Sequence, residues 1–402
     1  MKYIDEFRNK NLIQKIAEEI KAIMPDENIN IMEVCGTHTQ SFFRFGLDKL
    51  LPGNLRLIAG PGCPVCVSSS GYIDCAIQFA QDKDTIMVTF GDMLRIPGST
   101  SSLEETRARF GNVRVVYSAL DSLHIAKLHP DKKVIFLAVG FETTAPTVAA
   151  SILTAKKENL KNLFFFSSLK LIPPAMDFLV KDKRLNIQGF LCPGHVSAII
   201  GTRPYEFIPR KYRAGCCIAG FEPLDILEGL YILIKQIRNK KPQVENQYIR
   251  VVARNGNPKA KKINAQVFKV SPASWRGLGE IPQSGLKMRD EYSLFDAEKV
   301  FCIKRTTNGS TSSPSLELSR AKSMVRLRSP STLSNVEVSR DHAMPAGRQE
   351  PRTTRCKCGD VLKGLISPID CPLFSKVCRP DNPVGPCMVS NEGTCNAYYK
   401  YR

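Results

Sequence analysis

The stretch Ile29-Asn30-Ile31-Met32-Glu33-Val34-Cys35-Gly36-Thr37-His38-Thr39 is the one around which the rest of this chain is organised. A short apolar run that stops at a cysteine, a glycine and a histidine is typical of a strand end in an α/β fold, where such folds bind ligands. Cys35 offers a soft thiolate and His38 an imidazole, and both groups bind transition metals. A buried cysteine beside a turn histidine would give the same pattern, so this stretch alone leaves both interpretations open.

The same arrangement recurs over residues 29–230, where short apolar runs alternate with turns rich in Gly, Pro, Ser or Thr and with helical stretches. The predicted strands are Ile29–Val34, Leu55–Ala59, Thr85–Phe90, Val113–Tyr117, Val134–Val139, Leu163–Ser167, Ile187–Leu191 and Cys216–Ala219. Strands that are apolar throughout and alternate with helices indicate buried, largely parallel sheets. We therefore predict two similar α/β domains with mainly parallel sheets, preceded by an amphipathic helix over residues 3–24 and followed by a small Cys-rich C-terminal domain.

The bulk composition is that of a soluble globular protein with more than one domain. The chain has 402 residues, a length that exceeds what one ordinary hydrophobic core accommodates. Of these residues 43% are hydrophobic and 24% are charged, as in soluble globular proteins. No apolar run reaches the roughly 18 residues that a membrane span needs. The first ten residues are charged rather than signal-like. We expect a cytoplasmic protein that does not enter a membrane.

The net charge of +19 does not by itself predict nucleic-acid binding, because the basic residues form no stripe interleaved with aromatic residues. Residues 304–355 hold ten Lys or Arg against four Asp or Glu, and the remaining excess is spread thinly. A basic surface suits an acidic protein partner at least as well as a polynucleotide, so we expect no nucleic-acid partner. Residues 304–355 are also rich in Ser and Thr with few aromatics, which predicts a disordered insertion.

Polar residues follow several of the predicted strands directly. The loops in question begin at Cys35, Gly60, Gly91, Gly140, Pro193 and Gly220. Loops at the carboxyl ends of parallel strands share one edge of the sheet, so we expect their Cys, His, Asp and Glu side chains to converge on one site. Asp92, Glu142, His195 and Glu222 belong to these loops, and the sequence assigns no individual role to them.

The pair Cys63-Pro64-Val65-Cys66 follows the second predicted strand and Gly60-Pro61-Gly62. A C-x-x-C in this setting is a redox pair or half of a metal site, with buried structural cysteines as the alternative. No second pair lies nearby at zinc-finger spacing, which favours a redox-active dithiol. A helix is expected to begin close by, and its N-terminus would lower the pKa of one thiol.

The last 47 residues contain six of the fourteen cysteines, namely Cys356, Cys358, Cys371, Cys378, Cys387 and Cys395. In a reducing compartment this density indicates metal or redox chemistry rather than a disulfide framework. Six thiols exceed what one tetrahedral zinc needs, yet they match four ligands of a [4Fe-4S] cluster plus a spare pair. A Cys₄ zinc site with two bystander thiols is the alternative.

The single tryptophan of the chain, Trp275, is interpreted as a packing residue.

Several motifs in order resemble the HypD family of [NiFe]-hydrogenase maturation proteins. The matching stretches are Glu33–Thr39, Gly60–Cys66, Gly91–Gly98, Gly140–Pro146, Pro193–Ser197, Gly220–Leu224 and Cys371–Tyr399. The resemblance covers almost the whole chain apart from about residues 302–355, which makes it much more specific than any single motif.

The resemblance implies a scaffold on which the iron of the hydrogenase active site receives its cyanide and carbon monoxide ligands. It implies that a small HypC-type chaperone shares the iron and that HypE donates cyanide. The hydrogenase large subunit would be an indirect partner. By similarity Cys35 would bind the iron with His38 beside it, and Cys63 and Cys66 would form a redox pair. Four tail cysteines would hold the [4Fe-4S] cluster, with Cys358 and Cys387 as a second exchangeable pair; the four are Cys356, Cys371, Cys378 and Cys395.

The expected domains are residues 29–130 and 131–289, each an α/β unit, and residues 290–402, an iron–sulfur domain packed with the helix in residues 1–28. Two other functions stay open on the residues alone. One is a stand-alone iron–sulfur thiol-disulfide oxidoreductase, which would need the dithiols and the cluster but not Cys35. The other is a zinc-stabilised interaction protein.

Overall fold

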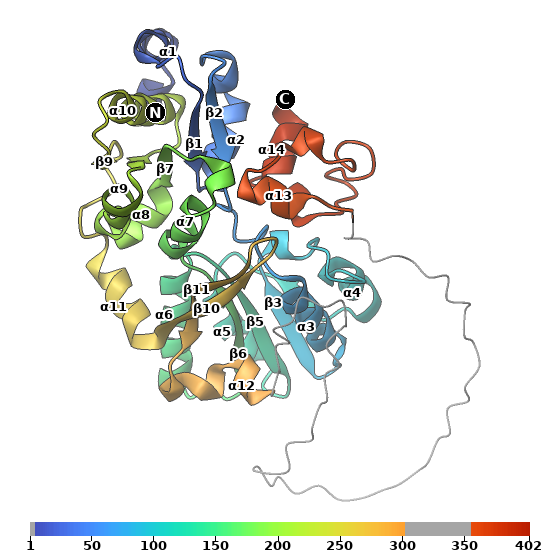
Figure 1. The fold of residues 1–402 in the computed structure, drawn as a ribbon. Coiled ribbons are helices and arrows are strands. Elements are labelled where there is room, and N and C mark those ends of the chain that lie inside the picture. The colour runs from blue at the N-terminus through green and yellow to red at the C-terminus, as the bar shows by residue number, and fades with distance from the viewer. Residues whose placement is uncertain (1–4, 302–354) are drawn as a thin grey trace, which may run out of the picture.

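The computed structural model describes residues 5–301 and 355–402, which form two parallel β-sheets with flanking helices, a long β-hairpin and a Cys-rich C-terminal region (Figure 1). The insertion predicted at residues 304–355 lies outside the described residues, apart from its last residue. The two sheets confirm the predicted α/β class with mainly parallel strands.

Sheet A has five strands, all paired in parallel. Their order is β2 (Leu55–Ala59), β1 (Ile29–Glu33), β7 (Gly189–Pro193), β8 (Gly215–Ala219) and β9 (Val244–Asn246). Strand β1 lies inside the sheet, because Ile31 pairs with Leu57 on one side and with Gly189 on the other. The loop that carries Cys35 therefore leaves a central strand, between the loops that follow β2 and β7.

Sheet B has four strands, also all parallel. Their order is β4 (Val113–Val115), β3 (Thr85–Thr89), β5 (Lys133–Gly140) and β6 (Leu163–Leu169). Every residue of β5 after Lys133 is buried, as expected of a strand covered by helices on both faces.

The eight predicted strands are all present, and each end lies within two residues of its prediction. The division between the sheets is different from the expected ranges. Strands β1 and β2 pair with β7 and β8, while the intervening strands β3 to β6 form sheet B. The contiguous ranges 29–130 and 131–289 therefore do not each hold one sheet, because sheet B is inserted between two halves of sheet A.

Helices cover both faces of sheet B. One face packs against α5 (Asp121–Leu128) and α6 (Ala145–Lys157), and the other against α3 (Ser70–Gln81) and α4 (Leu103–Phe110). The short helix α12 (Ala297–Val300) also packs on β6, so the chain just after residue 290 belongs with sheet B rather than with the Cys-rich region. Helix α11 (Pro258–Val267) lies against α6.

One face of sheet A packs against α1 (Lys10–Ile23), α2 (Gly36–Arg44) and α10 (Pro223–Arg238). Helix α1, which was expected beside the Cys-rich region, packs along α10 instead (Figure 1). The other face packs with α7 (Ile172–Val180), α8 (Gly194–Ile200) and α9 (Phe207–Tyr212). The hydrophobic cluster on this second face also includes Cys63, Cys66 and several cysteines of the C-terminal region.

The hairpin of β10 (Phe268–Trp275) and β11 (Gly279–Met288) was not predicted, and it is antiparallel. The Cys-rich region contains α13 (Cys358–Lys363) and α14 (Thr394–Tyr401). Helix α14 packs on α2, and α13 contacts β2. This places the C-terminal region beside the strand that leads to Cys35 (Figure 1).

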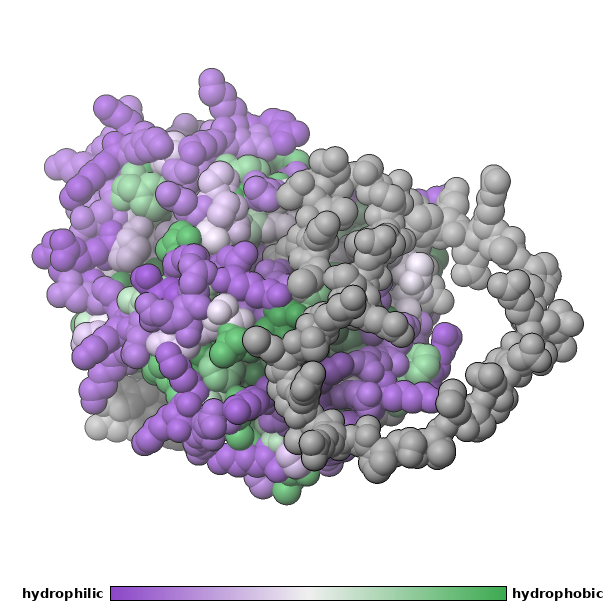
Figure 2. Space-filling model, turned by 90° about the horizontal axis from the view of Figure 1, so that it is seen from below, coloured by the Kyte–Doolittle hydropathy of each residue, from purple (hydrophilic) through white to green (hydrophobic). Residues whose placement is uncertain are grey.

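Hydrophilic residues dominate the face seen in Figure 2, with hydrophobic residues exposed in smaller patches between them. Among the helices in residues 5–301 and 355–402, none combines the length and the apolar character needed to cross a membrane.

Candidate functional site

Cys35 lies at the carboxyl end of β1, where the chain turns into α2. Its backbone N–H donates to Oε2 of Glu33 at 2.9 Å, and the N–H of Gly36 donates to the carbonyl of Gly62 at 3.1 Å. A Cβ on Gly62 would lie 2.2 Å from the backbone nitrogen of Cys35, so only glycine permits this approach. The loop that carries Cys63 is therefore packed directly against Cys35.

The Cys35 side chain is buried, with 8% of its surface exposed. Burial, together with the carboxylates of Glu392 and Glu33, raises the pKa of its thiol to about 12. Glu33 is itself buried, and burial raises its pKa to about 8 although it accepts hydrogen bonds from Thr39 and Cys35. A metal ion that binds this sulfur as thiolate must displace its proton.

His38, in the first turn of α2, is fully buried and neutral. Its Nε2 donates to the carbonyl oxygens of Gly220, at 2.9 Å, and Ala219, at 3.3 Å. Burial lowers the pKa of the imidazole to about 4. Because Nε2 carries the proton, Nδ1 bears a lone pair, and this atom has no hydrogen-bond partner among the described residues.

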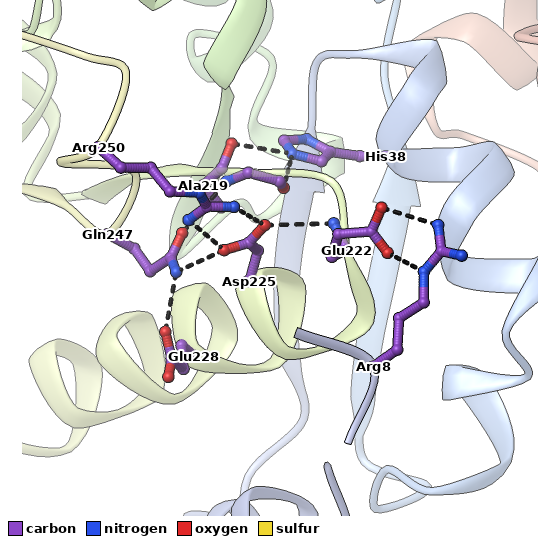
Figure 3. Close-up of polar contacts among 9 residues, drawn as sticks. Arg8, His38, Ala219, Glu222, Asp225, Glu228, Gln247 and Arg250 are labelled. Atoms are coloured by element: carbon purple, nitrogen blue, oxygen red, sulfur yellow. Dashed lines mark hydrogen bonds and ion pairs between the residues drawn. The ribbon is translucent and has the colours of Figure 1, made fainter. Parts of the chain in front are cut away.

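The loop that accepts the His38 hydrogen bonds is held by a polar network (Figure 3). Asp225 is wholly buried and receives both arms of the Arg250 guanidinium, at 2.8 and 2.6 Å. Gln247 donates to Asp225 at 2.8 Å and accepts from the N–H of Gly220 at 3.1 Å. A bidentate, buried ion pair of this kind fixes geometry, so the carbonyls that orient His38 are themselves fixed.

The same loop joins the chain's N-terminal part through Glu222. This residue caps α10 together with Asp225, and its carboxylate binds the guanidinium of Arg8 through two oxygens (Figure 3). Glu222 therefore has a structural partner at the edge of the site. His195, at the start of α8, stacks on Phe221 with ring centroids 4.0 Å apart, and the rings of Phe221 and His38 lie 4.8 Å apart.

A C-terminal segment closes the site from the other side. Thr37 donates to Oε1 of Glu392 at 2.8 Å, and a Cβ on Gly36 would lie 2.3 Å from the carbonyl oxygen of Glu392. Ser390 donates to Asp92 at 2.8 Å. One short segment before α14 thus bridges the start of α2, which follows β1, and the turn after β3. These two strands belong to different sheets.

Cys63 and Cys66 are buried and lie in a turn rather than at a helix end. The N–H of Cys66 donates to Sγ of Cys63 at 3.3 Å, while α3 begins only at Ser70. Burial raises the pKa of the Cys66 thiol well above its usual value. The expectation that a helix N-terminus would lower a thiol pKa here is therefore wrong, because no helix begins at the pair.

The six cysteines of the C-terminal region line one cavity. Its other lining residues are Leu373, Phe374, Gly385 and Met388. A Cβ at residue 385 would lie 2.5 Å from Sγ of Cys356, so glycine at this position leaves room for that thiol. A [4Fe-4S] cluster takes four cysteine thiolates, so this lining contains enough thiols for one cluster and a further pair. Across residues 5–301 and 355–402, no three His, Cys, Asp or Glu side chains are placed to hold a single metal ion.

The thiols of Cys358 and Cys387 interact with each other and also with those of Cys356 and Cys395, respectively. The Sγ atoms of Cys358 and Cys387 lie 2.7 Å apart. Cys387 also interacts with the thiol of Cys66, and Sγ of Cys66 lies 3.7 Å from the carbonyl oxygen of Pro386. The Cys63–Cys66 turn is thus continuous with the cysteine-lined cavity.

Glu142 follows β5, and its carboxylate makes a hydrogen bond at the start of α7. Its Oε1 accepts from the N–H of Ile172 at 2.9 Å, and burial raises its pKa to about 7. The structure thus brings Asp92, His195 and Glu222 near the surroundings of Cys35 and His38 through shared neighbours, while Glu142 makes its hydrogen bond to the start of α7.

Sequence reasoning missed several residues that shape the site. Glu33 and Glu392 border Cys35, and Asp225 with Arg250 supports His38. Glu33 lies two residues before Cys35 on the predicted strand, where a charged residue in an apolar run is an available signal. The other three become visible only once distant segments are brought together.

Comparisons with known proteins identify the family of the chain. A family model described as "Hydrogenase formation hypA family", named HypD, matches residues 10–317 and 318–402. A hydrogenase maturation factor HypD from Cupriavidus necator is 40% identical over 410 residues, covering 100% of this chain and 97% of the relative. The HypD of Escherichia coli is 38% identical over 409 residues, with 100% and 98% covered. This chain therefore belongs to the HypD family of hydrogenase maturation factors.

Proposed function

We propose that this chain is the scaffold on which the Fe(CN)2CO unit of [NiFe]-hydrogenase is assembled. The observation that supports this most directly is the placement of the Cys35 thiol beside the Cys63 loop and beneath the Glu392 segment. In this proposal Cys35 binds the incoming iron, which is cargo, and a HypC-type chaperone supplies a further ligand. A thiolate is a soft ligand suited to iron that carries cyanide and carbon monoxide.

His38 is proposed to act beside the iron as a neutral hydrogen-bond acceptor, because burial lowers its pKa to about 4 and disfavours the charged imidazolium. Its Nε2 proton is committed to the Gly220 carbonyl, so Nδ1 is the atom that can accept a hydrogen bond from a ligand. Glu33 and Glu392 supply carboxyl groups close to the same sulfur. The site can therefore hold the proton that Cys35 gives up when iron binds.

Cyanide is proposed to come from a thiocyanate carried by HypE, and its release requires two electrons. One thiocyanate and two cysteine thiols give one thiol on the donor, one cyanide, one disulfide and one proton. Cys63 and Cys66 are proposed to supply these electrons, and the packing of their loop against Cys35 supports this. The interaction of Cys66 with Cys387 offers the route for re-reduction.

Cys356, Cys371, Cys378 and Cys395 are proposed to hold a [4Fe-4S] cluster in the cavity they line. When bound, the cluster supplies single electrons. The remaining lining thiols, Cys358 and Cys387, are close enough to exchange between dithiol and disulfide. Both line the cavity, and Cys387 also interacts with the thiol of Cys66, so we propose that this pair connects the two centres.

Anaerobic copurification with the chaperone tests the proposal. Infrared spectra of the complex are expected to show bands of iron-bound CN and CO. These bands should disappear in Cys35→Ala and persist in the control Cys75→Ala, which removes a buried thiol of α3. Bands that survive in Cys35→Ala would overturn the assignment of Cys35.

The same variants separate the alternatives. A stand-alone iron–sulfur thiol oxidoreductase should keep full disulfide-reducing activity in Cys35→Ala, whereas the scaffold loses hydrogenase maturation with both redox centres intact. Metal analysis that finds zinc without iron or sulfide would support a zinc-stabilised interaction protein instead.

A further inference from the structure

The tip of the β10–β11 hairpin touches three parts of the molecule that the proposed function connects. The N–H of Arg276 donates to the carbonyl of Val67, next to Cys66, at 2.9 Å. The Arg276 guanidinium donates from both terminal nitrogens to the carbonyl of Pro97, each at 2.9 Å. A Cβ on Gly277 would lie 2.4 Å from Cα of Gly359, which follows Cys358.

The hairpin itself is held firmly behind this tip. Trp275 is 1% exposed, stacks on Phe141 at 5.9 Å and donates to Ser284 at 2.7 Å. The tryptophan is thus the packing residue that the sequence predicted. Its burial leaves Arg276, the next residue, facing the Cys-rich region.

The Arg276 side chain is a partly buried cation bonded only to a neutral oxygen. Within the described parts of the chain it forms no ion pair with a carboxylate. Burial lowers its pKa, while the thiols of Cys358, Cys356 and Cys387 and the carboxylate of Asp74 favour its charged form. Asp74 already accepts two hydrogen bonds from Ser99, at 2.7 and 2.6 Å.

A buried charge is expensive unless an opposite charge accompanies it. The cavity beside Arg276 gains negative charge when thiolates bind a cluster, and the cation is then compensated. We propose that Arg276 is a positioning residue that sets the reduction potential of the group held by the Cys-rich cavity. This inference rests on the proposed [4Fe-4S] cluster.

The direction of the effect follows from charge alone. A [4Fe-4S]2+ cluster with four thiolates carries −2, and uptake of one electron from an external reductant makes it −3. A nearby cation stabilises the more negative state, and it does so strongly where little water screens the interaction. Arg276 therefore raises the reduction potential, and its neutralisation lowers it.

The test is a redox titration of the purified full-length protein, followed by electron paramagnetic resonance of the reduced cluster. Arg276→Gln keeps an N–H donor for Pro97 but removes the charge, and Arg276→Lys keeps the charge. The matched control is Arg289→Gln, because Arg289 also donates to a carbonyl, that of Ala265 at 2.9 Å, at the far end of the same hairpin.

The glutamine variant is expected to disfavour reduction at least tenfold, which is about 59 mV for one electron. The lysine variant and Arg289→Gln should stay within threefold of the wild type. An unchanged potential in Arg276→Gln overturns the inference, and so does a lysine variant that shifts as far as the glutamine variant, since that marks a structural role.

Iron and sulfide analysis of each protein distinguishes failure of the proposed cofactor from failure of the inference about Arg276. A wild-type protein without a cluster overturns both this inference and the proposed cofactor. If a cluster is present and its reduction potential does not depend on the charge at residue 276, only this inference is overturned. If Arg276→Gln retains no cluster, Arg276→Lys decides alone, and a change of tenfold or more in that variant overturns the inference.

Discussion

The Sγ atoms of Cys358 and Cys387 lie 2.7 Å apart, so a small side-chain movement would bring them to bonding distance. Both side chains are buried, and Cys387 also interacts with Cys66. The pair is therefore shielded from solvent thiols, and under the proposed function it exchanges with the Cys63–Cys66 turn.

Mild oxidation of the full-length protein should join Cys358 to Cys387 before it joins other cysteines of the cavity. Peptide mapping by mass spectrometry under non-reducing conditions checks this. Cys358→Ser should abolish that crosslink, whereas Cys75→Ser should leave it unchanged. A dominant crosslink that uses Cys371 or Cys378 would contradict the pairing.

Gly277→Ala is expected to loosen the hairpin from the Cys-rich region. The residue has φ +81°, and its added Cβ would meet Cα of Gly359 at 2.4 Å. Gly279→Ala is the matched control, since Gly279 has φ +88° and nothing within 4 Å of its added Cβ. The control should cost about 1 kcal/mol of unfolding free energy for the left-handed backbone alone.

The difference between these two glycine variants isolates the contact with α13. Denaturant midpoints should place Gly277→Ala clearly below Gly279→Ala, and limited proteolysis should cut the Cys-rich region faster in the former. Equal midpoints would show that the hairpin tip is not packed against Gly359.

Glu142→Gln should change how stability depends on pH. Burial raises the pKa of Glu142 from 4.5 to about 7, so the folded state holds this proton more tightly than the unfolded state does. Its contribution to stability is therefore fully present below pH 4.5 and is lost as pH rises to about 7, at about 1.4 kcal/mol per pH unit.

Thermal midpoints of wild type and Glu142→Gln, measured from pH 4.5 to pH 8, check this sign. The variant should gain stability relative to the wild type as pH rises through that window, while exposed Glu280→Gln should show no such trend. A wild type that becomes relatively more stable toward pH 8 would contradict it.

Gly62→Ala should damage the Cys35 loop without unfolding the protein. Its added Cβ would lie 2.2 Å from the Cys35 nitrogen and 2.4 Å from Cys35 Cα, so the loop must shift. We expect iron-bound CN and CO bands to fall at least tenfold in complexes with the chaperone. Gly71→Ala, at an exposed position with nothing within 4 Å, should keep them, and it should be neutral or slightly stabilising.

The sequence predicted the strands well because each is a continuous apolar run with a turn signal behind it. Strand β9 was missed because Val244–Asn246 is short and polar. The hairpin was missed because Phe268–Trp275 is largely exposed along its length, so it lacks the pattern of a buried strand.

The sequence predicted where the strands are better than it predicted which strands pair with each other. An apolar run such as Ile29–Glu33 fits any neighbour of similar character, and nothing local specifies that Gly189–Leu191 lies beside it. The candidate site followed the same rule: Cys35, His38 and the cysteine pairs were visible as motifs. Contacts such as Thr37 with Glu392 depend on segments that meet only in three dimensions.

The insertion of sheet B into sheet A has a consequence for the order in which the chain acquires structure. The four strands of sheet B follow one another without interruption, so their pairing closes shorter loops than the pairing of β1 with β7 and costs less chain entropy. Strand β1 must wait for β7, and the Cys35 loop must wait for the segment that carries Glu392. During synthesis, Cys35 thus remains accessible long after its own strand has left the ribosome, and it gains its enclosed surroundings among the last events of folding.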